Sequence, residues 1–89
     1  MAKSDIKRDM KAMEFITGAK EEFKKFILRD HIDGIEVTEC AEKDGVFVLS
    51  GPVCVTSPTG KEKTYGYTAA VKVADDGECS LEDLKVVEP

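Results

Sequence analysis

The sequence predicts an α+β domain in which one long N-terminal helix packs on a four-stranded antiparallel β-meander. Before Asp33-Gly34 the apolar residues recur every three or four positions, which is typical of a helix, and after it they alternate with polar residues, as in strands. Short turn sequences divide the second part, and they leave no room for the crossovers of a parallel sheet. At 89 residues the chain is too short for a second core, so we expect one domain over residues 1–89.

The helix is predicted over residues 5–30. Ser4 is its expected N-cap, and His31 lies near the negative end of its dipole. Gly18 costs about 1 kcal/mol relative to alanine inside a helix, so either one helix bends there or two helices meet at Thr17-Gly18. The residues expected on the buried face are Ile6, Met10, Met13, Ile16, Ala19, Phe23, Phe26 and Ile27.

Four strands are predicted after the helix, each bounded by residues that favour turns. Their expected ranges are 35–41, 46–56, 62–74 and 80–88. The expected hairpin turns are Asp44-Gly45, Ser57–Gly60 and Asp75–Gly77. The third strand has the clearest alternation, with one face formed by Tyr65, Tyr67, Ala69, Val71 and Val73.

The second strand differs from the others in two respects. Ser50-Gly51-Pro52 interrupts it, and because proline donates no hydrogen bond to a ladder, we expect a bulge or an edge position there. Residues 46–49 (Val-Phe-Val-Leu) are apolar on both faces, so this part of the strand is expected to be covered on both sides.

Charge and hydropathy argue against nucleic acid and membrane as partners. The net charge is −5 and the isoelectric point is near 4.8, so most of the surface repels phosphate. Residues 1–30 carry a charge of +2 and residues 31–89 a charge of −7, which places a mildly basic helix on an acidic sheet. The longest apolar runs are a few residues, far below the roughly 20 that span a bilayer.

The cysteines predict a cytoplasmic protein with reduced thiols. Cys40, Cys54 and Cys79 are odd in number and cannot all pair within one chain. The first five residues lead into alternating charged and apolar positions, and we therefore expect no secretory signal. A signal removed before residue 1 would change this expectation.

Two site chemistries are open to these cysteines and to His31, the single histidine. A zinc site usually has two ligands separated by two to four residues, whereas no two of these cysteines are closer than 14 positions, so no metal is expected. A nucleophile pair of His31 with Cys40 or Cys54 has no helix N-terminus to stabilise the thiolate. No glycine-rich phosphate loop is present, and we predict no cofactor and no catalytic residues.

The predicted order of a helix followed by four strands resembles the cystatin-like arrangement, in which a long helix crosses a curved antiparallel sheet. Residues 48–51 (Val-Leu-Ser-Gly) are similar to the small-residue hairpin loop of cystatins. The glutamine of that loop is missing and the chain has no tryptophan, so we assign no site residues from the resemblance and expect no protease inhibition.

Two functions follow as hypotheses. The first is a small interaction module that binds a protein partner or a second copy through the exposed sheet face, because one of the pairs Val46/Val48 and Phe47/Leu49 lacks a covering layer. The second is an enzyme or ligand carrier with a pocket between helix and sheet. The aromatic residues expected to line that pocket are Phe15, Phe23, Tyr65 and Tyr67. The lack of a clustered acid, base or nucleophile favours the first hypothesis.

Overall fold

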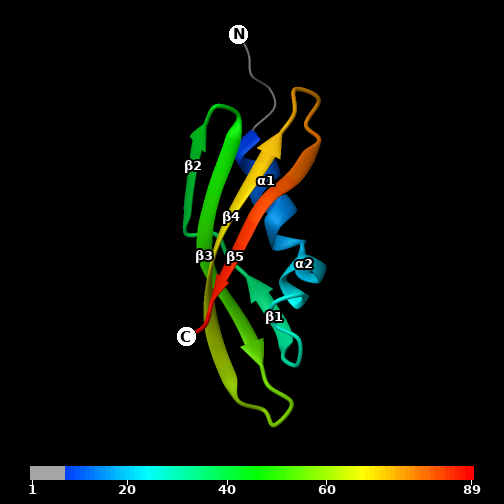
Figure 1. Cartoon of the computed structure of the whole chain (residues 1–89), viewed down its shortest axis with the longest axis vertical. Coiled ribbons are helices and arrows are strands. Elements are labelled where there is room, and N and C mark those ends of the chain that lie inside the picture. The colour runs from blue at the N-terminus through cyan, green and yellow to red at the C-terminus, as the bar shows by residue number, and fades with distance from the viewer. Residues whose placement is uncertain (1–7) are drawn as a thin grey trace.

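A computed structural model describes residues 8–89, which form two short helices and a five-stranded antiparallel sheet (Figure 1). In chain order the elements are α1 (Arg8–Thr17), α2 (Lys20–Lys24), β1 (His31–Ile35), β2 (Glu39–Lys43), β3 (Val46–Thr56), β4 (Glu62–Val73) and β5 (Cys79–Val87). The α+β class is confirmed. The single long helix and the four-strand meander are wrong.

The helix predicted over residues 5–30 breaks after Gly18, which decides between the two interpretations left open. The amide of Ala19 bonds to the carbonyl of Ile16 at 3.1 Å, and Ala19 leaves the helical region with ψ at 46°. The second helix ends at Lys24, well before residue 30, and the chain then turns so that Ile27 enters the core. The expected helix start at residue 5, its cap Ser4 and Ile6 lie outside the described residues.

The break also changes which helical residues are buried. Ala12, Ile16, Phe23 and Ile27 lie in the core, whereas Met10 and Phe26, both predicted to be buried, are exposed. A single helical period cannot be extended across an interruption, so residues beyond α2 do not continue the stripe that begins in α1.

The strand predicted over residues 35–41 is also wrong, because this segment joins two strands. It contains the last residue of β1, a connection over residues 36–38 and the first part of β2. Asp33-Gly34 lies inside β1, where the register against β3 shifts between Ile32 and Gly34 as in a β-bulge. His31, expected at a helix end, is the first residue of β1.

The sheet has the order β1-β3-β4-β5, and β2 also pairs with β3. Both β1 and β2 therefore occupy the same edge of β3, one against each half of that strand. β3 has the bounds predicted for it, β4 ends one residue earlier than predicted, and β5 both begins and ends one residue earlier. At the β2–β3 turn, Asp44 and Gly45 both have positive φ (54° and 82°), the geometry of a type I′ hairpin.

The interruption predicted at Ser50-Gly51-Pro52 is the point where β3 changes partner from β2 to β1. The ladder with β4 runs unbroken through it. The carbonyl of Pro52 accepts a hydrogen bond of 3.0 Å from the amide of Glu36, in the β1–β2 connection. Because the N–H and C=O of a strand residue point the same way, the N–H that Pro52 lacks would also face this connection, and the β4 ladder loses nothing.

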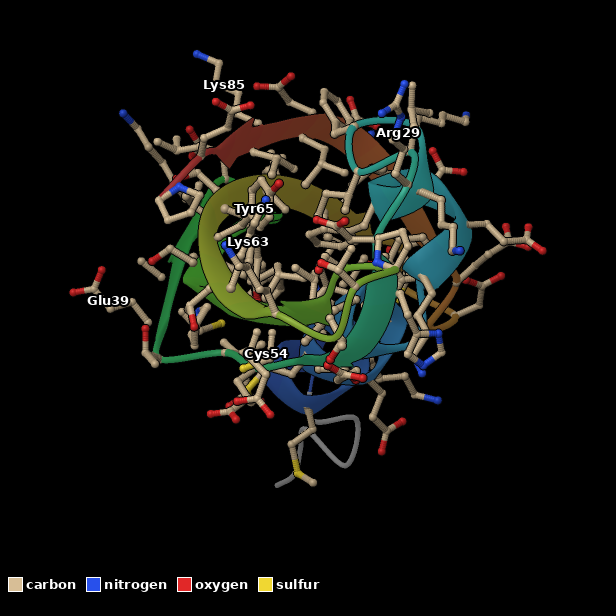
Figure 2. The ribbon with its side chains drawn as sticks, turned by 90° about the horizontal axis from the view of Figure 1, so that it is seen from below. Arg29, Glu39, Cys54, Lys63, Tyr65 and Lys85 are labelled. Atoms are coloured by element: carbon tan, nitrogen blue, oxygen red, sulfur yellow. The ribbon has the colours of Figure 1, made fainter. Side chains whose placement is uncertain are left out.

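The core fills the space between the helices and the concave face of the sheet, which curls around it (Figure 2). Alternate residues of β4, Tyr67, Ala69, Val71 and Val73, are buried as predicted. Phe23 of α2 packs edge-to-face on Tyr67, with ring centroids 5.2 Å apart. Within residues 8–89 no helix is both long enough and apolar enough to cross a membrane.

Candidate functional site

The outer face of the sheet carries an exposed apolar position in β3. Phe47 and Leu49 are buried in the core, whereas Val48 points the other way and is 42% exposed. The expectation that residues 46–49 are covered on both sides is therefore wrong for Val48. Its neighbours in register are Ala41 of β2 and Ala70 of β4, and the three form a row across the strands.

Charged residues lie in the rows on either side of this apolar row. Glu39 of β2 is in register with Ser50, and Lys43 of β2 is in register with Val46. The hydroxyl of Ser50 donates a hydrogen bond of 3.1 Å to the carboxylate of Glu39, which holds that side chain on the outer face. Figure 2 shows Glu39 pointing away from the interior of the sheet.

We call these five residues the outer patch: Ala41, Val48 and Ala70 with Glu39 and Lys43. An open depression of about 620 Å³ lies over much of it. The residues lining the depression are Glu39, Cys40, Ala41, Val48, Ser50 and Thr68. The patch thus combines an apolar centre, an open depression and one charge of each sign.

The three cysteines are free and lie on three different strands. Burial raises the pKa of the Cys40 thiol, and the nearby carboxylate of Asp9 raises it further. Burial also raises the pKa of Cys79, which Lys11 partly offsets. A raised pKa keeps a thiol protonated, so neither environment activates a nucleophile. Among residues 8–89, no three histidine, cysteine or acidic side chains are grouped so as to hold a metal.

His31 is placed beside a carboxylate instead of a thiol. Its side chain is largely exposed, with Nε2 lying 3.7 Å from Oδ1 of Asp33, and the hydroxyl of Thr56 donates to the other oxygen of that carboxylate. Cys54 is two register pairs away, opposite Gly34, and Cys40 is on the strand that pairs with the other half of β3. The structure does not bring together the nucleophile pair considered from the sequence.

The aromatic residues considered as a pocket lining belong to the core. Phe23 and Tyr67 are buried against each other, and Phe15 and Tyr65 pack on the core from its margin. The hydroxyl of Tyr67 donates a hydrogen bond of 2.8 Å to the carbonyl of Glu36. The two central rings therefore occupy the space in which the second hypothesis places a ligand.

The sequence does not show that Glu39 and Lys43 share a face, because the predicted strand bounds are wrong there. In the sequence Glu39 belongs to an acidic cluster with Glu36, Glu42 and Asp44, and a strand ending at residue 41 excludes Lys43. In β2 as observed, residues 39, 41 and 43 share one face, since side chains alternate along a strand.

No known protein family matches the chain, and neither any curated protein nor any solved structure matches it significantly. The likeness to the cystatin-like arrangement thus stays a prediction from the order of elements.

Proposed function

We propose that the protein is a non-catalytic interaction module that self-associates through the outer patch as a two-fold dimer. The observation that carries the proposal is the exposed Val48, centred in an apolar row and flanked by Glu39 and Lys43 in the adjacent rows. An interface built by a two-fold axis must be complementary to itself. The outer patch meets this requirement in one specific orientation.

In this orientation the two-fold axis runs along the row of Ala41, Val48 and Ala70. Each of these three residues then faces its own copy, so Val48 packs on Val48. The row continues into β5 at Asp83, which the curl of the sheet carries away from the axis (Figure 2). The rotation places the row on one side of the axis opposite the row on the other side. Glu39 of each chain therefore lies opposite Lys43 of the other chain. An axis along β3 would instead set Lys43 opposite Lys72, two like charges, and is disfavoured. The strands of the two copies therefore run antiparallel across the interface.

The dimer is expected to be weak. Burying the exposed part of Val48 contributes on the order of 1 kcal/mol per chain, and each exposed ion pair contributes roughly 0–1 kcal/mol. The apolar centre is small compared with the roughly 800 Å² per partner of a stable interface. We therefore expect a dissociation constant on the order of 1 mM.

The alternative of an enzyme or a ligand carrier has less support. Phe23 and Tyr67 fill the region between helix and sheet, and the thiols of Cys40 and Cys79 have raised pKa values. The three free cysteines favour a reducing compartment, so we propose the cytoplasm as the location.

Replacing Val48 by aspartate tests the proposal. In sedimentation equilibrium the apparent mass of the wild-type protein should rise from 9.8 kDa toward twice that value as its concentration increases. Val48→Asp should stay monomeric throughout, because two carboxylates would meet on the axis. Thr64→Asp is the matched control, since Thr64 is exposed on the same face but lies outside the outer patch, and it should dimerise like wild type. A wild-type chain that is monomeric at about 1 mM, or equal association of the two variants, would refute the proposal.

A further inference from the structure

A second surface lies at the end of the sheet away from the outer patch, between the segment after α2 and the first residues of β4. It is a groove of about 300 Å³. Its lining residues are Phe26, Ile27, Leu28, Arg29, Asp30, Lys63 and Tyr65. Figure 2 shows Lys63 and Tyr65 on the inner side of β4, with Arg29 on the loop across from them.

The backbone of β4 is unpaired along this groove. β5 ends at Val87, opposite Gly66, so residues 62–65 of β4 have a neighbouring strand only on the β3 side. Since Pro52 directs its carbonyl away from β4, Gly66 opposite it directs its own polar groups toward β5. The direction of these backbone groups alternates along a strand. The N–H and C=O groups of Thr64 and Glu62 therefore point to the same side as those of Gly66, at a level that β5 does not reach.

No other backbone segment of residues 8–89 bonds to these groups of Thr64 and Glu62. A free strand edge beside a groove is the geometry in which an added peptide strand is bound: its main chain bonds to the edge and its side chains alternate into and out of the groove. Glu88 and Pro89, which follow β5, do not pair with β4, and an added strand would take their place beside residues 62–65 and continue the sheet.

The side chains around the groove define the chemistry of the peptide. Phe26 is 52% exposed and Leu28 is 79% exposed, unusually high for large apolar residues. Arg29 and Lys63 are exposed and have no ion-pair partner among residues 8–89. Asp30, the one carboxylate in the lining, is buried, so the charges presented to solvent are positive.

We propose that this groove binds an extended segment of a partner protein in which apolar and acidic residues are both present, by strand addition to β4. The amide and carbonyl groups of Thr64 and Glu62 hold the main chain of the segment. Its apolar side chains cover Phe26 and Leu28, and its carboxylates pair with Arg29 and Lys63. The site is on a different face from the outer patch, and binding here does not require self-association.

Amide NMR with a defined peptide tests the proposal, using the Val48→Asp variant so that self-association does not contribute. The probe is a blocked hexapeptide, Thr-Val-Thr-Glu-Thr-Val, in which valine and glutamate occupy the alternate positions that face the groove and threonine the positions between them. The amides of Thr64 and Glu62 should shift and exchange more slowly with solvent, whereas the exchange of the Lys63 and Tyr65 amides, which face β3, should not change. The same peptide with lysine in place of glutamate should bind at least about tenfold more weakly.

Two variants separate the groove from nonspecific attraction. Lys63→Glu should weaken binding of the valine-glutamate peptide at least about tenfold, whereas Lys61→Glu, an equal charge change in the β3–β4 turn outside the lining, should weaken it less than about threefold. A peptide with proline at the threonine positions should not bind, because in a strand antiparallel to β4 these residues supply the N–H groups that bond to Thr64 and Glu62. The proposal is overturned by equal binding of the lysine peptide, by equal effects of the two variants, or by uniform protection of residues 62–65.

Discussion

At the scale of single residues, Tyr67 links the core to the irregular edge of the sheet. Its ring packs on Phe23, and its hydroxyl donates to the carbonyl of Glu36 in the β1–β2 connection. Burial raises the pKa of Tyr67 to about 12, and the neighbouring Cys40 contributes in the same direction. The ring of Tyr67 thus fills part of the core, and its hydroxyl anchors the β1–β2 connection.

This pKa predicts a loss of stability in alkali. Below pH ~10, the usual tyrosine value, Tyr67 is neutral in both the folded and the unfolded chain, so its ionisation does not change the free energy of unfolding. The stabilisation is then lost as the pH rises from ~10 to about 12. Tyr67→Phe, which lacks the ionisable group, should cost about 1 kcal/mol at neutral pH through its lost hydrogen bond. In urea unfolding, the difference in free energy of unfolding between wild type and Tyr67→Phe should shrink across this pH range. A difference that stays constant with pH would contradict the raised pKa of Tyr67.

Burial of individual residues could be predicted from the sequence wherever one period continues without interruption. The alternation along β4 correctly gives Tyr67, Ala69, Val71 and Val73 as core residues. The helical period fails at Phe26, because the chain has left α2 before that residue. The exposure of Phe26 and Leu28, on which the proposed groove depends, follows from this turn and has no local sequence signal.

At the scale of elements, the β1–β2 connection determines the shape of the sheet edge. It passes so close to β3 that a Cβ atom on Gly51 would overlap the carbonyl oxygen of Glu36 and lie 3.1 Å from the amide nitrogen of Thr38. The same carbonyl of Glu36 accepts the hydrogen bond from Tyr67. The glycine is therefore needed for a close approach of two backbones, a role that glycine in a strand often has.

Replacing Gly51 by alanine should accordingly destabilise the fold. The clash involves backbone atoms that cannot move freely, and we expect a loss of about 1–3 kcal/mol in urea unfolding. Gly66→Ala is the matched control, because Gly66 is opposite Pro52 on β4 and a Cβ atom there meets nothing within 4 Å. The loss in free energy of unfolding caused by Gly66→Ala should stay below about 1 kcal/mol. Equal losses for the two variants would show that the connection does not press on β3.

The sequence indicated that Ser50-Gly51-Pro52 is special but not why. Proline in a strand predicts an edge or a bulge from local chemistry alone. Here the edge of β3 pairs with β2 before the interruption and with β1 after it. This arrangement depends on pairing between distant segments, which local chemistry does not show. For the same reason the sequence predicts residues 35–41 as one strand, since their alternation contains no sign of the connection at residues 36–38.

At the scale of the whole molecule, the fold leaves two surfaces open on different faces. The outer patch lies on the sheet face that the helices do not cover, and the groove opens at the end of β4 where β5 stops. The sequence indicated that one apolar pair of the second strand lacks a covering layer within the chain, and of Val46 and Val48 only Val48 is exposed. It did not predict the proposed pairing of Glu39 with Lys43 across a two-fold axis, because this requires the register of β2.

The central claim, that the outer patch pairs with itself across a two-fold axis, is tested most directly by exchanging its two charges. Glu39→Lys would set two lysine side chains against each other, and Lys43→Glu would set two glutamates together, so each single variant should associate at least about tenfold more weakly than wild type. The double variant Glu39→Lys/Lys43→Glu restores opposite charges at both positions and keeps the wild-type net charge. Sedimentation equilibrium should return its dissociation constant to within about threefold of the wild-type value. A double variant as weak as the single ones, or single variants that dimerise like wild type, would contradict the claim.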